Sequence, residues 1–148
     1  MVLTGLVNDV KIAEVLDGNI GRGSARDIFS YKDEPNWVIK QHRFQPHFSN
    51  MIEWIIWNQI KETESLKDIF GECAAMSVSG RYLVMEKLVD LTKVDGPQTL
   101  RYPSWLTDRK ISNFGRSSSG IIKIRDFGQL VLGDTLARGP LEQIQVFR

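Results

Sequence analysis

The sequence predicts an α+β fold, and three patterns lead to that prediction. Between Lys11 and Lys40, apolar and polar side chains alternate in short runs, which is typical of strands. From Asn50 the apolar period becomes that of a helix. Two more strand-like runs follow between Ala75 and Glu86. We therefore expect five antiparallel strands and one helix, followed by a smaller second part.

The first three strands are expected at Lys11–Asp17, Asp27–Tyr31 and Trp37–Lys40. Gly18–Gly23 has three glycines in six positions, which predicts a flexible turn between the first two strands. Lys32–Asn36 contains a proline and supplies the next turn. Together these segments predict an antiparallel meander.

The helix and the last two strands of the first part follow. Ser49 or Asn50 is expected to cap the helix, and its apolar face is formed by Met51, Ile52, Trp54, Ile55, Ile56 and Ile60. The two strands are Ala75–Ser79 and Tyr82–Glu86.

The second part has fewer periodic signals. We expect strands at Ile121–Ile124 and Gln129–Leu132, and one or two helical turns at Leu141–Phe147. The whole chain, residues 1–148, is expected to form one domain.

Composition and charge argue against several classes of function. Nineteen basic and eighteen acidic residues leave a net charge of +1, so a broad electrostatic grip on nucleic acid is not expected. No stretch approaches the roughly 20 apolar residues that span a bilayer. The N-terminus lacks the basic region of an export signal, and the single Cys73 cannot form an internal disulfide. We expect a cytoplasmic protein.

The most informative motif lies in the second part. Asp108–Asn113 has the form D-x-K-x-x-N, and the triplet Asp-Phe-Gly begins at Asp126, eighteen residues after Asp108. A hairpin over Phe114–Ile124 fits between them. This arrangement resembles the catalytic loop and metal-binding triplet of the protein-kinase family. The resemblance implies a kinase-like fold with an N-lobe at 1–88 and a much reduced C-lobe at 89–148.

The same resemblance implies a role for each polar residue of the motif. Asp108 would orient a substrate hydroxyl and accept its proton, and Lys110 would neutralise charge on the transferred phosphoryl group. Asn113 and Asp126 would hold Mg²⁺.

Upstream, Lys40 resembles the kinase strand lysine that contacts the phosphates of ATP, and Glu53 would pair with it. Two local alternatives stay open. Lys40 could face solvent on its strand, and Glu53 could complete a capping box with Asn50.

Nucleotide contacts are implied at two further places. Gly21 and Gly23 resemble the first two glycines of the kinase loop that covers the phosphates, with Arg26 in place of the third. An ordinary glycine-containing hairpin is the alternative. The run that ends at Leu88 resembles the fifth strand and hinge, where the Glu86 carbonyl and the Leu88 backbone would bind adenine.

The chain also departs from the family pattern. Leu106 and Thr107 replace the usual His-Arg, so control by phosphorylation of an activation loop is not expected. Only twenty positions separate Leu88 from Asp108, and twenty residues follow Gly128. The helical platform for a peptide substrate is therefore not expected.

The resemblance implies an ATP- and Mg²⁺-dependent phosphotransferase that acts on a Ser or Thr hydroxyl of a protein, of the truncated type found in bacteria and bacteriophages. The alternative is a kinase-shaped protein that binds a nucleotide or a partner without useful turnover, such as a pseudokinase-like inhibitor or regulator. Loss of the platform favours the alternative. A homodimer that buries the flank left by the missing helices is a further expectation.

For the remaining notable residues we expect structural and not catalytic or metal-binding roles. His42 and His47 are five apart, which does not suit two zinc ligands on one helix, and a surface loop is expected for both. Trp54 and Trp57 are expected to pack in the core. Cys73 is expected to be a buried or inert thiol.

Overall fold

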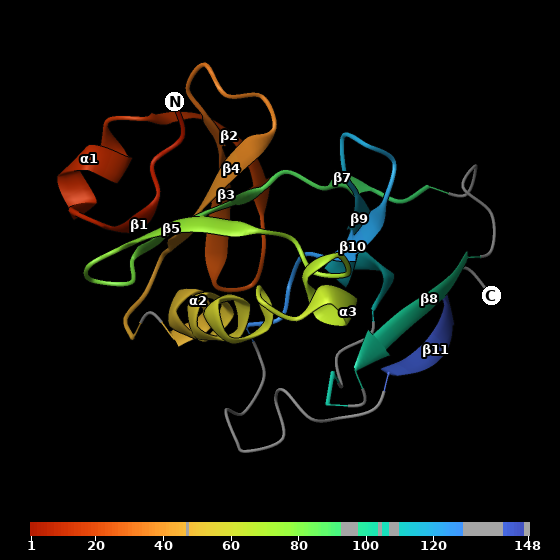
Figure 1. Cartoon of the computed structure of the whole chain (residues 1–148). Helices are drawn as coiled ribbons and strands as arrows, with labels where there is room; N and C mark the ends of the chain where they lie inside the picture. Colours follow the sequence, from red (N-terminus) through yellow and green to blue (C-terminus); the bar gives the residue numbers. More distant parts are fainter. Residues whose placement is uncertain (47, 93–97, 104, 107–109, 129–140, 147–148) are drawn as a thin grey trace.

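The computed structural model describes residues 1–46, 48–92, 98–103, 105, 106, 110–128 and 141–146. It is an α+β structure built on a six-stranded mixed sheet (Figure 1). In spatial order the strands are β1 (Gly5–Val7), β5 (Cys73–Ser77), β6 (Tyr82–Glu86), β4 (Trp37–His42), β3 (Arg26–Tyr31) and β2 (Leu16–Arg22). The α+β class is confirmed and the kinase-like fold stays a prediction, but the prediction of five strands is wrong. The additional strand β1 pairs in parallel with β5, so the sheet is not purely antiparallel.

The N-terminal segment corrects the expectation of a strand at Lys11–Asp17. A short helix, α1 (Asp9–Ala13), begins there because the Asn8 side chain accepts a hydrogen bond of 2.8 Å from the Val10 backbone N–H and caps it. The helix buries Ile12 completely. Strand β2 starts only after it and continues through Gly18 and Gly21, so most of the expected turn is strand.

Two more helices follow β4. Helix α2 (Phe48–Ile60) packs against β5 and β6 along one face of the sheet (Figure 1). Helix α3 (Glu64–Lys67) is a single turn. The first part therefore contains three helices instead of one, because two are too short to produce a clear apolar period.

The later residues form two small sheets. Strands β7 (Val89–Asp90), β9 (Phe114–Arg116) and β10 (Ile122–Ile124) are antiparallel, and the predicted hairpin over β9 and β10 is confirmed. Strands β8 (Gln98–Pro103) and β11 (Leu141–Val146) also pair antiparallel.

The pairing of β11 contradicts the helical turns expected at Leu141–Phe147, because a strand partner about forty residues upstream leaves no trace in a local pattern. The predicted strand at Gln129–Leu132 lies outside the described residues. The division of the chain at residue 88 stays a prediction.

A cluster of buried apolar side chains joins the early and late parts of the chain. Phe70 stacks on Trp105 with ring centroids 5.6 Å apart and meets Phe127 edge-on at 5.0 Å. The backbone N–H of Gly71 donates to the carbonyl of Ile124 at 2.8 Å. These contacts fix the chain immediately before and within the Asp-Phe-Gly triplet. No helix among the described residues is long and apolar enough to cross a membrane.

Candidate functional site

The ion pair expected between Lys40 and Glu53 is present. Lys40 lies in β4 with a buried side chain, and its Nζ is 3.1 Å from Oε2 of Glu53, which is fully buried in α2. A solvent-facing lysine is therefore ruled out. The capping-box alternative is wrong as well, because α2 begins at Phe48 and Asn50 lies inside the helix.

A third residue, Arg26, joins this ion pair to Asp126, which the sequence pattern does not predict. Its Nη2 donates to Oε1 of Glu53 at 2.7 Å and to Oδ1 of Asp126 at 3.2 Å. Its Nη1 donates to Oδ1 of Asn50 at 3.0 Å. We call the side chains of Arg26, Lys40, Asn50, Glu53 and Asp126 the Glu53 cluster.

Asn50 fixes one end of the Glu53 cluster to the sheet. Its Nδ2 donates to the backbone carbonyls of Gly80 and Arg81, both at 2.9 Å. Its backbone N–H donates to Nε2 of His42 at 3.2 Å. The surface loop expected for His42 is therefore wrong: it ends β4 and is buried. His47 lies outside the described residues.

The pKa values of the buried charged residues in the Glu53 cluster shift in different directions. Burial alone raises the pKa of Glu53, but the positive charges of Arg26 and Lys40 outweigh burial and lower this pKa. Burial lowers the pKa of Lys40, and the attraction of Glu53 does not restore it because Arg26 repels the same ammonium. Burial also lowers the pKa of Arg26, but Glu53 more than compensates and the pKa is raised. Lys40 is therefore the cation that gives up its proton more readily.

Cys73 lies directly behind the Glu53 cluster. Its Sγ is 3.9 Å from the Glu53 carbonyl oxygen. Burial and the negative charge of Glu53 raise the pKa of the Cys73 thiol well above its usual value. The thiol stays protonated, in agreement with the expectation of a buried, inert cysteine.

The Asp-Phe-Gly triplet packs against the start of α2. The Asp126 side chain is 43% exposed, so solvent reaches the carboxylate that Arg26 contacts. Phe127 is buried in the core. A Cβ added to Gly128 would lie 2.7 Å from the carbonyl oxygen of Ser49, so only glycine allows this approach.

The other predicted metal and catalytic residues lie near this triplet or outside the described part. The Asn113 carbonyl accepts a hydrogen bond of 2.8 Å from the backbone N–H of Arg125, which brings the end of the predicted catalytic loop beside Asp126. Lys110 is exposed. Asp108 lies outside the described residues.

The amide of Asn113 and the carboxylate of Asp126 are hard oxygen donors, and Mg²⁺ takes such ligands from proteins together with phosphate oxygens. The donor chemistry therefore fits the metal. No group of three His, Cys, Asp or Glu that could form an all-protein site is found within the described ranges.

One predicted adenine contact, the Leu88 carbonyl, is engaged by a neighbouring side chain. The Leu88 carbonyl accepts a hydrogen bond of 2.8 Å from Nη1 of Arg125. The Glu86 carboxylate pairs with Lys123 at 3.0 Å. The glycines lie beside Arg26: Gly21 is inside β2, and the Gly23 N–H donates to the Arg26 carbonyl at 2.8 Å.

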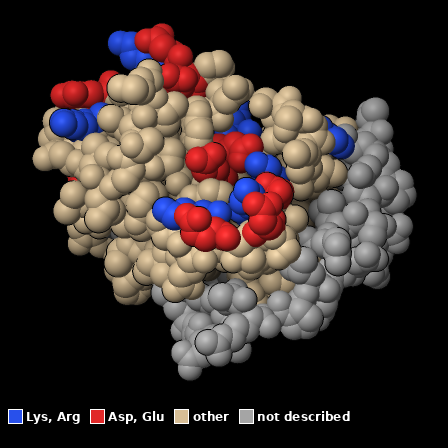
Figure 2. Space-filling view, viewed as in Figure 1, with Lys and Arg blue, Asp and Glu red and all other residues tan. Residues whose placement is uncertain are grey.

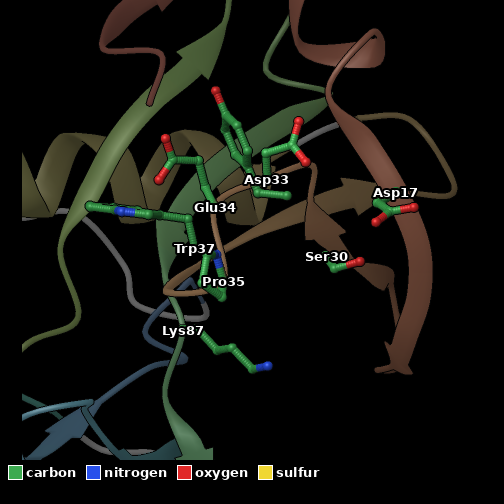
Figure 3. Close-up of a pocket in the computed structure, with 8 residues that line it drawn as sticks. Asp17, Ser30, Asp33, Glu34, Pro35, Trp37 and Lys87 are labelled. Carbon is green, nitrogen blue, oxygen red and sulfur yellow. The ribbon is translucent and has the colours of Figure 1, made fainter. Parts of the chain in front are cut away.

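Surface features add little to this site. Acidic and basic side chains are interspersed on the face drawn in Figure 2. A pocket elsewhere in the first part is lined by Asp33 and Glu34 from the turn before β4, together with Trp37 and Lys87 (Figure 3). It shares no residue with the Glu53 cluster.

A scan against models of known protein families finds no match to this chain, and a search of curated proteins finds no match either.

Proposed function

We propose that the chain is an ATP- and Mg²⁺-dependent phosphotransferase of the protein-kinase type that acts on a Ser or Thr hydroxyl of a protein. One observation carries the proposal: the buried ion pair of Lys40 and Glu53 lies directly beside the Asp-Phe-Gly triplet. Lys40 Nζ also donates to the carbonyl of Arg125, the residue before Asp126. Protein kinases use a lysine oriented by a glutamate next to a metal-binding aspartate for phosphoryl transfer.

In this proposal each residue of the site has a separate role. Lys40, held by Glu53, would contact the phosphates of ATP, and Asn113 and Asp126 would hold Mg²⁺. When bound, the metal neutralises charge on the phosphates. Asp108 would orient the acceptor hydroxyl and take its proton, and Lys110 would stabilise the charge that builds on the transferred group.

A second candidate function is a kinase-shaped binding protein without useful turnover. Two contacts favour it: Arg26 already holds the Asp126 carboxylate, and Arg125 already holds the Leu88 carbonyl. Both contacts compete with groups of MgATP that the first candidate function needs.

The two candidates are tested by binding and by turnover. We expect a non-hydrolysable ATP analogue with Mg²⁺ to raise the melting temperature of the wild-type chain, because a ligand that binds only the folded state stabilises it. The variant Asp126→Asn should lose this effect, while Asp68→Asn, an exposed control on the far end of α3, should keep it.

Transfer of radiolabelled phosphate from ATP to a general protein acceptor then separates the candidates. Transfer supports the phosphotransferase, and stabilisation without transfer to any acceptor supports the binding protein. A wild-type chain that no nucleotide stabilises would rule out the nucleotide site.

A further inference from the structure

Arg26 places a positive charge beside the Asp126 carboxylate. The Glu53 cluster contains two positive side chains, Arg26 and Lys40, and two carboxylates, Glu53 and Asp126. Its charges are therefore balanced without a metal ion.

Arg26 is a fixed part of this arrangement. The side chain is only 8% exposed, and its planar guanidinium spans three partners on two different segments. Two of these partners, Asn50 and Glu53, belong to α2 and are completely buried. An arginine held in this way loses little further freedom when it binds a carboxylate, so the contact with Asp126 is preorganised.

We propose that Arg26 is a competing cation that sets the affinity of Asp126 for divalent metal. A metal ion that takes Oδ1 of Asp126 has to displace the guanidinium. This inference rests on the proposed function in one respect: it takes Asp126 as a metal ligand.

The geometry permits such displacement. The Asp126 side chain is 43% exposed, so an ion from solvent can reach it. If Arg26 releases Asp126, its guanidinium keeps the shorter bond to Glu53 and the bond to Asn50. Arg26 would therefore weaken metal binding without abolishing it, through charge repulsion and through competition for Oδ1.

Mn²⁺ binding without nucleotide tests this inference. Free Mn²⁺ is measured by electron paramagnetic resonance in titrations of the wild-type chain and of Arg26→Gln, Arg43→Gln and the double variant Arg26→Gln/Asp126→Asn. Arg43→Gln is the matched control, because it removes the same charge from a neighbouring arginine that pairs with Asp27 at 2.8 Å.

We expect Arg26→Gln to bind Mn²⁺ at least roughly fivefold more tightly than the wild type, as removal of a close positive charge predicts. Arg43→Gln should stay within about twofold, because the charge of Arg43 is paired with Asp27 and not with Asp126. The double variant should lose the gain. Equal affinities of Arg26→Gln and Arg43→Gln, or a gain that survives Asp126→Asn, would overturn the inference.

Arg26→Lys covers the case in which Arg26→Gln does not fold, as judged by circular dichroism. A single ammonium can remain at Glu53 but cannot bridge to Asp126 with a planar fork. Mn²⁺ should then bind more tightly than to Arg43→Gln, and an equal affinity would contradict the proposal.

The Mn²⁺ titration contains no ATP. A negative result in it therefore contradicts the role of Arg26 without deciding whether the chain transfers phosphate. A chain that no nucleotide stabilises, but whose Arg26→Gln variant gains Mn²⁺ affinity, would keep this inference and lose the phosphotransferase.

Discussion

Arg26 and Asp126 are 100 residues apart in the sequence, and the guanidinium Nη2 of one lies 3.2 Å from the carboxylate Oδ1 of the other. This contact fastens strand β3 to the segment that follows β10. Because Glu53 also binds Arg26 and Lys40, the Glu53 cluster is assembled from four separate stretches of chain: β3, β4, α2 and the segment after β10.

Removal of the shared carboxylate should strongly destabilise the fold. Glu53→Gln would leave Arg26 and Lys40 buried without their common counterion, which costs about 3–5 kcal/mol in comparable sites. Urea unfolding followed by tryptophan fluorescence measures this change. Glu64→Gln, whose carboxylate is 89% exposed and pairs with Lys67, is the control and should leave the midpoint unchanged. Equal midpoints for the two variants would contradict the buried role of Glu53.

The lowered pKa of Glu53 predicts how stability depends on acid. In the unfolded chain the pKa of this carboxyl is about 4.3. In the folded protein its pKa is lower, because the positive charges of Arg26 and Lys40 favour the charged form more than burial disfavours it. The stabilisation is fully present above the unfolded pKa and is lost as pH falls through the folded pKa.

We therefore expect the free energy of unfolding to fall more steeply below pH 4.3 in the wild type than in Glu53→Gln, where that contribution is absent. Urea unfolding from pH 6 to pH 3 measures both slopes. Parallel slopes would show that Glu53 does not titrate as its surroundings indicate.

Replacement of Gly128 should disturb the docking of the triplet on α2. In Gly128→Ala the new Cβ would lie 2.7 Å from the carbonyl oxygen and 2.9 Å from the Cβ of Ser49. We expect a loss of about 1–3 kcal/mol, as is typical of overpacking. The matched control is Gly18→Ala, where nothing lies within 4 Å of the added Cβ. Thermal unfolding should separate the two variants, and similar melting temperatures would argue against the close approach.

The catalytic role proposed for Asp108 has a kinetic test. Asp108→Asn should keep the ATP affinity of the wild type and reduce phosphate transfer by at least roughly a hundredfold, the usual effect of losing acid or base assistance. Labelled-phosphate assays and calorimetry measure these quantities separately. Undiminished transfer by Asp108→Asn would exclude Asp108 from the mechanism.

The sequence predicted the elements whose signals are local. Strands β3, β4 and β6 were placed within a few residues because alternation and turn residues mark their ends. The late hairpin was placed for the same reason. Strands β1 and β11 were missed because each depends on a distant partner, and α1 was missed because its signal is a single cap at Asn8.

The candidate site was predictable only in part. The pairing of Lys40 with Glu53 followed from the motif order. The role of Arg26 did not, because an arginine beside two glycines reads as a solvated turn residue. Its partners lie 24, 27 and 100 positions away, and only the folded chain shows that they converge. A sequence signal did exist in retrospect: Arg26 stands where the resembled family has a glycine.

The strand order of the main sheet also affects how two copies of the molecule could associate. Its two borders are β1, which is three residues long, and β2, whose pairing is interrupted twice between Leu16 and Gly21. Short and irregular border strands offer a poor template for an incoming strand, which protects a sheet against fibrous growth. If two copies associate, as the expected homodimer requires, helical or loop surfaces are better suited to form that contact than strand addition at either border.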